Sequence, residues 1–262
     1  MKAFLSGLAN VWPRYATIFA LLAVLGVLGL IYGYRFGFWG LGPVFNGFRT
    51  AIPILGIAAL LSAAGAGALL FRKSWLASVA ALSVAAAAGG LAYLPIWMRG
   101  EGAKVPPIHD ITTDTMDPPA FVAILPLRED APNPAAYDPE QTAQQLEAYP
   151  DLEPLIMPLS APEAFEIALS AVEAEGLKLV AVVPEEGRIE AYETVPLFGF
   201  KDDVVVRLQS AGEITTVIDI RSKSRVGRSD LGFNARRIRS MLDHMEAVGG
   251  SIAAPTGEEQ DA

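Results

Sequence analysis

The densest group of polar side chains lies between residues 219 and 237, where an expected strand runs into an expected helix. Arginine guanidinium groups match the geometry of carboxylates and phosphates, and Gly227 and Gly232 allow the backbone to approach a ligand closely. The start of the helix adds free N–H groups, which bind anions. The pattern favours a site for an anionic ligand or a partner. The residues expected to form it are Asp110, Asp114, Arg221, Ser222, Ser224, Arg225, Arg228, Asp230, Asn234 and Arg237.

The same residues also have a purely structural interpretation. Asp230 precedes the expected helix and can cap its N-terminus with a side-chain oxygen. Other aspartates can pair with the arginines and so tie the first strand and a sheet turn to this segment. These aspartates are Asp110, Asp114, Asp202 and Asp203. The sequence leaves both interpretations open, since an arginine-rich loop can serve structure and binding together.

Other chemistry is poorly represented in the sequence. The absence of cysteine excludes a thiol nucleophile, a disulfide scaffold and a Cys-ligated metal. His109 and His244 are far apart, and no acidic loop has calcium-site spacing. No Gly-x-Ser-x-Gly segment marks a hydrolase nucleophile. We therefore expect no catalytic residue, metal or cofactor. The alternative function is an envelope enzyme that uses the Asp and Arg residues in acid–base chemistry.

The elements that must position the polar residues predict an α+β domain. Ile108–Thr115 is a possible first strand, and the Pro-rich passage Asp117–Pro139 cannot be helical throughout. Ser160 and Glu163 form a capping box for a helix that ends at Gly176. The helix is followed by four strands with short links, which indicate an antiparallel meander. The four strands are Leu177–Val183, Arg188–Thr194, Asp203–Gln209 and Ile214–Arg221.

A final helix is expected over Leu231–Ala247. Its apolar stripe faces the sheet, and we expect Arg236, Arg237 and Arg239 to point towards water. Two helices on one face of an antiparallel sheet make a two-layer domain. The aromatic tip Phe198–Phe200 is interpreted as packing on this domain, with contact to a membrane or partner as the alternative.

The N-terminal part of the chain has a very different composition. Residues 1–100 contain 7 of the 20 Lys and Arg residues and none of the 29 Asp and Glu residues. The rest of the chain therefore carries 13 − 29 = −16 charges. Such an acidic balance disfavours nucleic-acid binding. The mean hydropathy of the whole chain is nevertheless +0.36, which reflects the apolar N-terminal part.

Three uncharged stretches are long enough to cross a bilayer, which requires about 20 residues. They predict transmembrane helices at about residues 15–34, 50–71 and 74–97. The second and third are rich in Ala and Gly and are expected to pack closely as a hairpin. The passage from Arg35 to Arg49 is expected to lie at the membrane interface, because it is rich in aromatic residues and glycine. No Asp, Glu, Lys or Arg lies within the spans, so transport by these helices is not expected.

The orientation of the anchor rests on weak charge asymmetry. With the N-terminus inside, four Lys and Arg residues face the cytoplasm and four face outward. The free amino terminus and the short Arg72–Lys73 turn favour this arrangement. It predicts a multi-pass protein of the inner (cytoplasmic) membrane whose C-terminal domain is periplasmic.

The segment Ile220–Arg239 resembles the hallmark segment of the DUF1499 family. Four further segments extend the resemblance over most of residues 105–248. These are Asp110–Asp114, Pro118–Phe121, Tyr149–Asp151 and Phe198–Asp203. Members of that family occur in bacteria and plant plastids, often behind a signal or anchor. The resemblance implies a domain without a settled activity and supplies no catalytic residues.

Together these observations predict a three-helix transmembrane anchor over residues 1–99, a soluble domain over 100–248 and a disordered tail over 249–262. The expected function is binding of an envelope protein partner or of a lipid or other anionic or amphiphilic ligand. A scaffold within a membrane complex is a further alternative, in which the Ala- and Gly-rich hairpin matters more than the domain.

Overall fold

The computed structural model describes the backbone of residues 2–253 and the side chains of residues 10–249. The chain divides into two compact units, Met1–Gly100 and Glu101–Ala262. Most of the predicted tail, residues 254–262, lies outside the described residues, and the final helix continues to Ala253.

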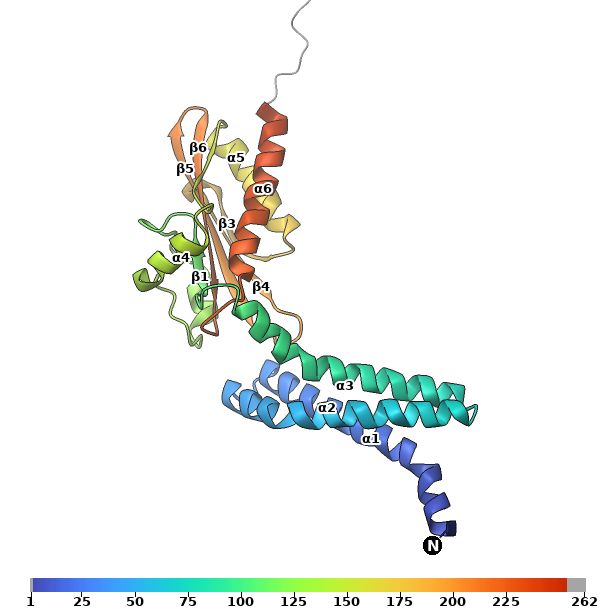
Figure 1. Cartoon of the computed structure of the whole chain (residues 1–262). Coiled ribbons are helices and arrows are strands. Elements are labelled where there is room, and N and C mark those ends of the chain that lie inside the picture. Colours follow the sequence, from blue (N-terminus) through green and yellow to red (C-terminus); the bar gives the residue numbers. More distant parts are fainter. Residues whose placement is uncertain (1, 254–262) are drawn as a thin grey trace, which may run out of the picture. The chain divides into compact units, whose positions relative to one another are not determined.

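The first unit consists of three long apolar helices (Figure 1). They are α1 (Lys2–Arg35), α2 (Leu41–Phe71) and α3 (Trp75–Gly102). Each contains a stretch long and apolar enough to cross a membrane. α2 begins at Leu41 rather than Thr50, because Pro43 is compatible with the first turn of a helix. The connection between α1 and α2 is therefore shorter than the sequence suggested.

Small polar side chains tie the helices of this unit together. The Ser62 hydroxyl donates to the Ala81 carbonyl at 2.9 Å, and Ser78 donates to Ala66 at 2.8 Å. These bonds join α2 to α3 across the predicted close hairpin. In a membrane such bonds, together with close packing of small residues, replace the hydrophobic driving force that acts in water.

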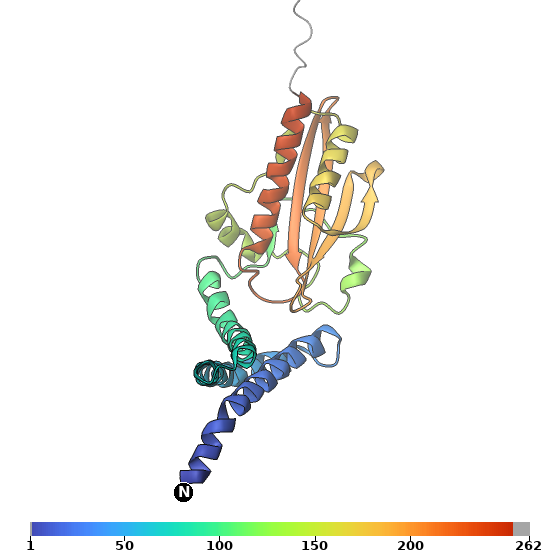
Figure 2. The same ribbon diagram turned by 90° about the vertical axis from the view of Figure 1, so that its right-hand side faces the viewer.

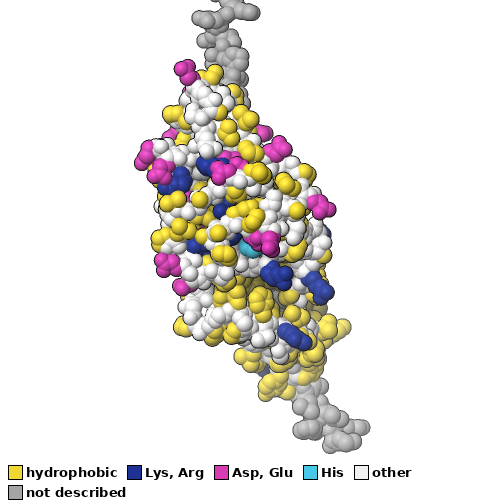
Figure 3. Space-filling model, turned by 90° about the vertical axis from the view of Figure 1, so that its left-hand side faces the viewer, with side chains coloured by type: hydrophobic (Ala, Val, Ile, Leu, Met, Phe, Trp, Pro, Cys, Tyr) yellow, Lys and Arg dark blue, Asp and Glu magenta, His cyan; other side chains and the backbone are white. Residues whose placement is uncertain are grey.

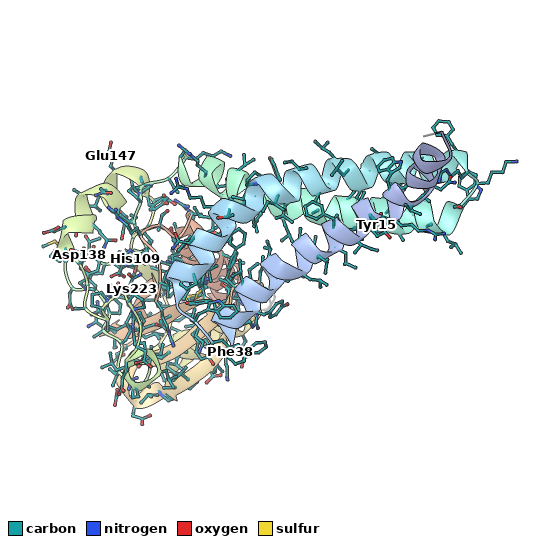
Figure 4. All side chains as sticks on the ribbon, turned by 90° about the horizontal axis from the view of Figure 1, so that it is seen from below. Tyr15, Phe38, His109, Asp138, Glu147 and Lys223 are labelled. Carbon is teal, nitrogen blue, oxygen red and sulfur yellow. The ribbon has the colours of Figure 1, made fainter. Side chains whose placement is uncertain are left out.

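The turn between α1 and α2 folds back on α1. The Trp39 indole N–H donates to the Leu30 carbonyl at 2.9 Å, and its ring lies where a side chain on Gly33 would project. Phe38 is 75% exposed and projects from the turn (Figure 4). This exposed aromatic suits the headgroup region at the end of a membrane span.

The second unit is built on a six-stranded antiparallel sheet with the order β1-β6-β5-β4-β3 and with β2 also paired to β6. The strands β3 to β6 form the predicted meander. The central pair, β5 and β6, is longer than predicted. The strands are β1 (Asp110–Thr112), β2 (Leu155–Met157), β3 (Lys178–Val183), β4 (Arg188–Thr194), β5 (Lys201–Gly212) and β6 (Thr215–Ser224).

Two helices cover one face of the sheet, as predicted (Figure 2). They are α5 (Ala161–Ala174) and α6 (Phe233–Ala253). The Ser160 N–H donates to the Glu163 carboxylate at 3.1 Å, and Gly176 adopts φ +69° beyond the end of α5. Alternate residues of β5, such as Val204 and Val206, face these helices and are completely buried.

The opposite face is covered by the chain between β1 and α5. This arm, residues 113–148, contains two 3-10 turns, η1 (Leu125–Arg128) and η2 (Pro139–Gln141), and the helix α4 (Thr142–Ala148). Phe121 and Ile124 pack on Val205 of β5. The predicted non-helical arm is therefore a second cover for the sheet, and α4 and β2 were not foreseen. A further 3-10 turn, η3 (Pro184–Glu186), joins β3 to β4.

One end of the sheet collects segments that are distant in sequence. Cross-strand pairing places Asp110, Lys223, Asp203, Tyr192 and Lys178 in one row across five strands. We call this the proximal end, because the chain enters the domain there through β1. The turn 195–200, the start of α6 and the end of α5 belong to the same end.

The packing of α1 on α2 provides a matched pair of substitutions. A Cβ on Gly65 would lie 3.1 Å from Pro13 Cα, whereas one on Gly67 would meet nothing within 4 Å. We predict that Gly65→Leu destabilises the helical unit by about 1–3 kcal/mol through overpacking and that Gly67→Leu does not. Unfolding by SDS in mixed micelles, followed by helical circular dichroism, measures the difference. Equal effects of the two substitutions would contradict this close approach of α1 to α2.

Candidate functional site

The face of the sheet that the arm covers carries a buried group of charges centred on Asp110. The Arg221 guanidinium donates twice to its carboxylate, at 2.9 Å each, and Lys223 Nζ donates at 2.7 Å. Asp110 is fully buried, and Lys223 is 1% exposed. Burial lowers the pKa of Lys223, while the charge of Asp110 opposes that shift.

Asp203 forms a second buried centre next to the first. Its carboxylate accepts from Arg225 at 2.6 Å and lies 3.2 Å from a nitrogen of Arg128. Burial raises the pKa of Asp203 in spite of these two cations. Isolated charges are very costly in a protein interior, so each carboxylate depends on its cations.

These cations also fix the arm through its backbone carbonyls. Arg221 donates to Pro119 and Ala135, at 3.1 and 3.0 Å, and Lys223 donates to Ala136 at 2.8 Å. Arg225 binds the Leu127 carbonyl. A buried guanidinium has five N–H groups to satisfy, and carboxylates together with arm carbonyls supply the acceptors. We call Asp110, Asp203, Arg221, Lys223 and Arg225 the covered charge network.

Glu190 makes a comparable contact that sequence reasoning missed. Its fully buried carboxylate accepts from the N–H groups of Val122, Ala123 and Ile124, at 2.9 to 3.2 Å. It also binds Arg188. The only sequence signal was a glutamate at an alternating position of a strand, which ordinarily faces water.

Asp114 pairs with a different arginine from those in the predicted site. Its carboxylate lies 3.3 Å from Arg207 of β5, which also binds Asp219 at 2.8 Å and Asp117 at 2.8 Å. Desolvation raises the pKa of Asp219, which is 1% exposed. Asp114 therefore belongs to a separate ion-pair group, which joins the arm to β5 and β6.

The helix-covered face of β6 carries two serines, which bond to Asn234 and to an ion-paired arginine of α6. Ser222 donates to the Asn234 side-chain carbonyl at 2.7 Å, and the Asn234 amide donates to Ser224 at 3.1 Å. Arg237 donates to Ser222 at 2.7 Å and binds Asp202 and Glu193. Arg237 is 5% exposed, so its expected position towards water was wrong. It follows Asn234 by three residues and therefore shares its inward face of α6.

Asp230 caps α6, as the structural interpretation expected. Its carboxylate accepts from the N–H groups of Gly232 and Asn234 at 2.8 and 2.7 Å. Desolvation raises its pKa, against the effect of these bonds. The helix start is thus already occupied by an internal anion. Arg228, in the preceding loop, is exposed.

The ten predicted residues are therefore not one constellation. Successive side chains of a strand point to opposite faces, so Arg221 and Arg225 separate from Ser222 and Ser224. Most of the ten form internal bonds on one face or the other. Arg237 is the only one of the ten among the residues that line the hollow described next.

A hollow of about 270 Å³ opens at the proximal end, between the end of α5, β4 and the first turns of α6. Within it, the Arg236 guanidinium lies 4.4 Å from the centre of the Phe233 ring, which is 46% exposed. The hollow combines an aromatic surface, guanidinium groups, a hydroxyl and carboxylates. Its lining residues are Glu175, Glu193, Phe233, Arg236, Arg237 and Ser240.

A Ser–His contact joins α5 to α6, at Ser170 and His244. Ser170 Oγ lies 3.0 Å from His244 Nε2 and 2.7 Å from the Ile167 carbonyl. Because the carbonyl can only accept, the hydroxyl proton goes to Ile167, and His244 Nε2 donates to Ser170. A nitrogen that donates this proton is not a general base for the serine, so the pair joins two helices.

His109 lies beside the charge network, on the same side of the domain as Asp138 and Lys223 (Figure 4). Burial and the positive charge of Lys223 lower its pKa below the ordinary 6.5, against the opposing charges of Asp110 and Asp138. No group of three or more His, Cys, Asp or Glu side chains within the described residues is arranged to hold a metal ion.

The comparisons with known proteins identify a family but no activity. Residues 110–245 match the family described as "Protein of unknown function (DUF1499)". No curated protein and no solved structure shows a significant match to the chain. The matched region contains β1 to β6, the arm and most of α6.

The charge network predicts a large difference between two substitutions at predicted site residues. Asp110→Asn leaves Arg221 and Lys223 buried without their anion, which costs about 3–5 kcal/mol. Arg228→Ala removes an exposed side chain and should change stability by less than about 0.5 kcal/mol. The urea midpoint of the full-length protein in detergent, read by protease cleavage of the unfolded domain, measures both. A midpoint for Asp110→Asn equal to that of Arg228→Ala would contradict a structural role of the network.

Proposed function

The chain belongs to the DUF1499 family of proteins of unknown function, and we propose that it is a membrane-anchored binding protein. Its C-terminal domain takes an amphiphilic ligand with an anionic group into the hollow at the proximal end. The three apolar helices keep the domain at the membrane, where amphiphiles are concentrated.

The observation that carries this proposal is the composition of the hollow. Arg236 is exposed and forms no ion pair with a carboxylate of the described residues; one nitrogen donates to the Leu231 carbonyl at 3.3 Å, and its other N–H groups can bind a phosphate or carboxylate. Phe233 offers an apolar surface beside it, and Ser240 offers a hydroxyl. Glu193 is bound to Arg237, so Arg236 and Glu175 carry the remaining charges of the lining, and Arg236 is the group that can bind an anion.

A binding role fits the buried charges better than the enzymatic alternative does. Asp110, Asp202 and Asp203 are nearly or fully buried and bonded to cations. An acid–base catalyst needs a carboxyl group within hydrogen-bond reach of a substrate. These aspartates meet internal partners instead, and the exposed groups of the hollow are suited to recognition.

The proposed ligand class is tested with a matched pair of amphiphiles, dodecyl phosphate and dodecyl maltoside. We predict that the full-length protein binds the phosphate and that Arg236→Ala weakens this binding about tenfold or more, the effect of losing a charge-assisted hydrogen bond. Native mass spectrometry or calorimetry measures both variants.

Arg228→Ala is the matched control, because it removes an exposed arginine of the same segment that does not line the hollow. It should leave binding of the phosphate unchanged. Equal binding of both amphiphiles, or equal loss in the two variants, would show that Arg236 and the hollow do not select the ligand.

We further propose that the protein lies in the inner (cytoplasmic) membrane with the domain on the periplasmic side. The even distribution of Lys and Arg residues around the spans makes this a matter for direct measurement. The chain has no cysteine, so Ala211→Cys, in the exposed β5–β6 hairpin, creates a single labelling site. We predict that an impermeant maleimide labels this cysteine in right-side-out vesicles. Labelling in inverted vesicles alone would place the domain in the cytoplasm.

A further inference from the structure

Most Lys and Arg side chains of the domain form ion pairs within it. Thirteen Lys and Arg residues follow residue 100. Nine of them form ion pairs with carboxylates of the described residues. The four that form none with this part of the chain are Lys178, Lys201, Arg228 and Arg236.

All four of these cations lie at the proximal end. Lys178 opens β3 and pairs with Tyr192 in the row that contains Asp110, while Lys201 opens β5. Both ammonium groups lie over the Tyr192 ring, at 5.5 and 5.3 Å from its centre. Arg228 and Arg236 flank the start of α6. The unpaired positive charge of the described domain is therefore confined to one end.

The opposite end of the sheet carries acidic side chains. Glu185 and Glu186 lie in the turn between β3 and β4, and Glu213 lies in the β5–β6 hairpin. Acidic side chains are also scattered over the face of the domain seen in Figure 3. The proximal end also holds acidic side chains, namely Glu129, Asp130, Glu173 and Glu175, but all four cations that lack an ion pair within the described residues lie there. The free cations, and not the net charge, therefore distinguish the proximal end from the opposite end.

The chain that leaves the last predicted span is fixed to the same end. The final residues of α3, from Glu101 onward, belong to the second unit. A Cβ on Gly102 would lie 3.1 Å from Leu231, and Val105 lies next to Gly232 at the start of α6. Ile108 is then buried in the core. The cationic end is thus within a few residues of the membrane span, measured along the chain.

We propose that the proximal end is a docking surface for a lipid bilayer that contains anionic lipids. Juxtamembrane cations are attracted to such a surface, and the attraction falls off within a Debye length. The Leu127 carbonyl makes the contact of the arm with Arg225, and the Leu125 and Leu127 side chains, which are 43% and 50% exposed, add apolar surface at this end. The bilayer is the occupant favoured by the four free cations of this end and by its attachment to the span.

The test compares two dye positions in the full chain, reconstituted in vesicles. Ala174→Cys places the dye at the end of α5, near Lys178, and Ala211→Cys places it in the distal hairpin; both alanines are exposed. The vesicles contain phosphatidylcholine alone or an equal mixture with phosphatidylglycerol. Quenching by a lipid with a quencher in its headgroup region measures how closely each dye approaches the bilayer.

We expect the dye at residue 174 to be quenched more strongly than the dye at 211, and more strongly in anionic than in neutral vesicles. Removing one cation should weaken the association about fivefold. The double variant Lys178→Gln, Lys201→Gln should therefore lower the quenching in anionic vesicles to the value in neutral vesicles. About 0.5 M salt should have the same effect without any substitution. Neither lysine lines the hollow, so this test and the test of the ligand can fail separately.

The proposal is overturned if quenching at residue 174 is the same in neutral and anionic vesicles, or if it is unchanged by both salt and the lysine substitutions. The salt measurement uses the unsubstituted lysines and therefore decides the question even if the double variant folds poorly.

Discussion

The contact on which the domain depends is the buried bond of Asp110 to Arg221 and Lys223. It joins β1 to β6 and, through the remaining N–H groups of both cations, holds the arm over the sheet. Burying such charges costs several kcal/mol each, so the network is weak evidence for stability. The network nevertheless fixes the path of the arm, because any other path would leave buried charged groups without hydrogen-bond partners. The network therefore specifies one arrangement of a segment with little regular structure.

β6 can serve two faces because its side chains alternate. Arg221 and Lys223 face the arm, while Ser222 and Ser224 face α6 and meet Asn234. A slip of one residue against β5 would turn the charges towards the helices and the serines towards the arm. Each face supplies partners that suit only one set, so the polar residues fix the register of the strand more firmly than apolar residues of similar size could.

Local patterns were sufficient to predict the meander, the capped helix α5 and the three apolar helices, because these depend on period and end signals. β1 lies within the predicted first strand Ile108–Thr115, but the sixth strand was not accessible, since β2 is only three residues long and exists through pairing with β6. The inward position of Arg237 and the burial of Glu190 also escaped prediction. Charged residues at these positions ordinarily face water, and only the distant partners Asp202, Glu193 and the arm backbone reverse that preference.

The segment that carries the family resemblance is thus largely devoted to holding the fold. The aspartates, serines and arginines from Asp219 to Arg237 mostly bond to other parts of the domain, so their pattern reports architecture rather than chemistry. Arg236 stands among them in sequence, yet its charge is not used by any carboxylate of the described residues. Its guanidinium bonds the Leu231 carbonyl and lies over the Phe233 ring, but its charge is left to act on another molecule. Two of the four cations without internal anions, Arg228 and Arg236, thus belong to the resembling segment itself, and they differ from their neighbours in having no carboxylate partner within the described residues.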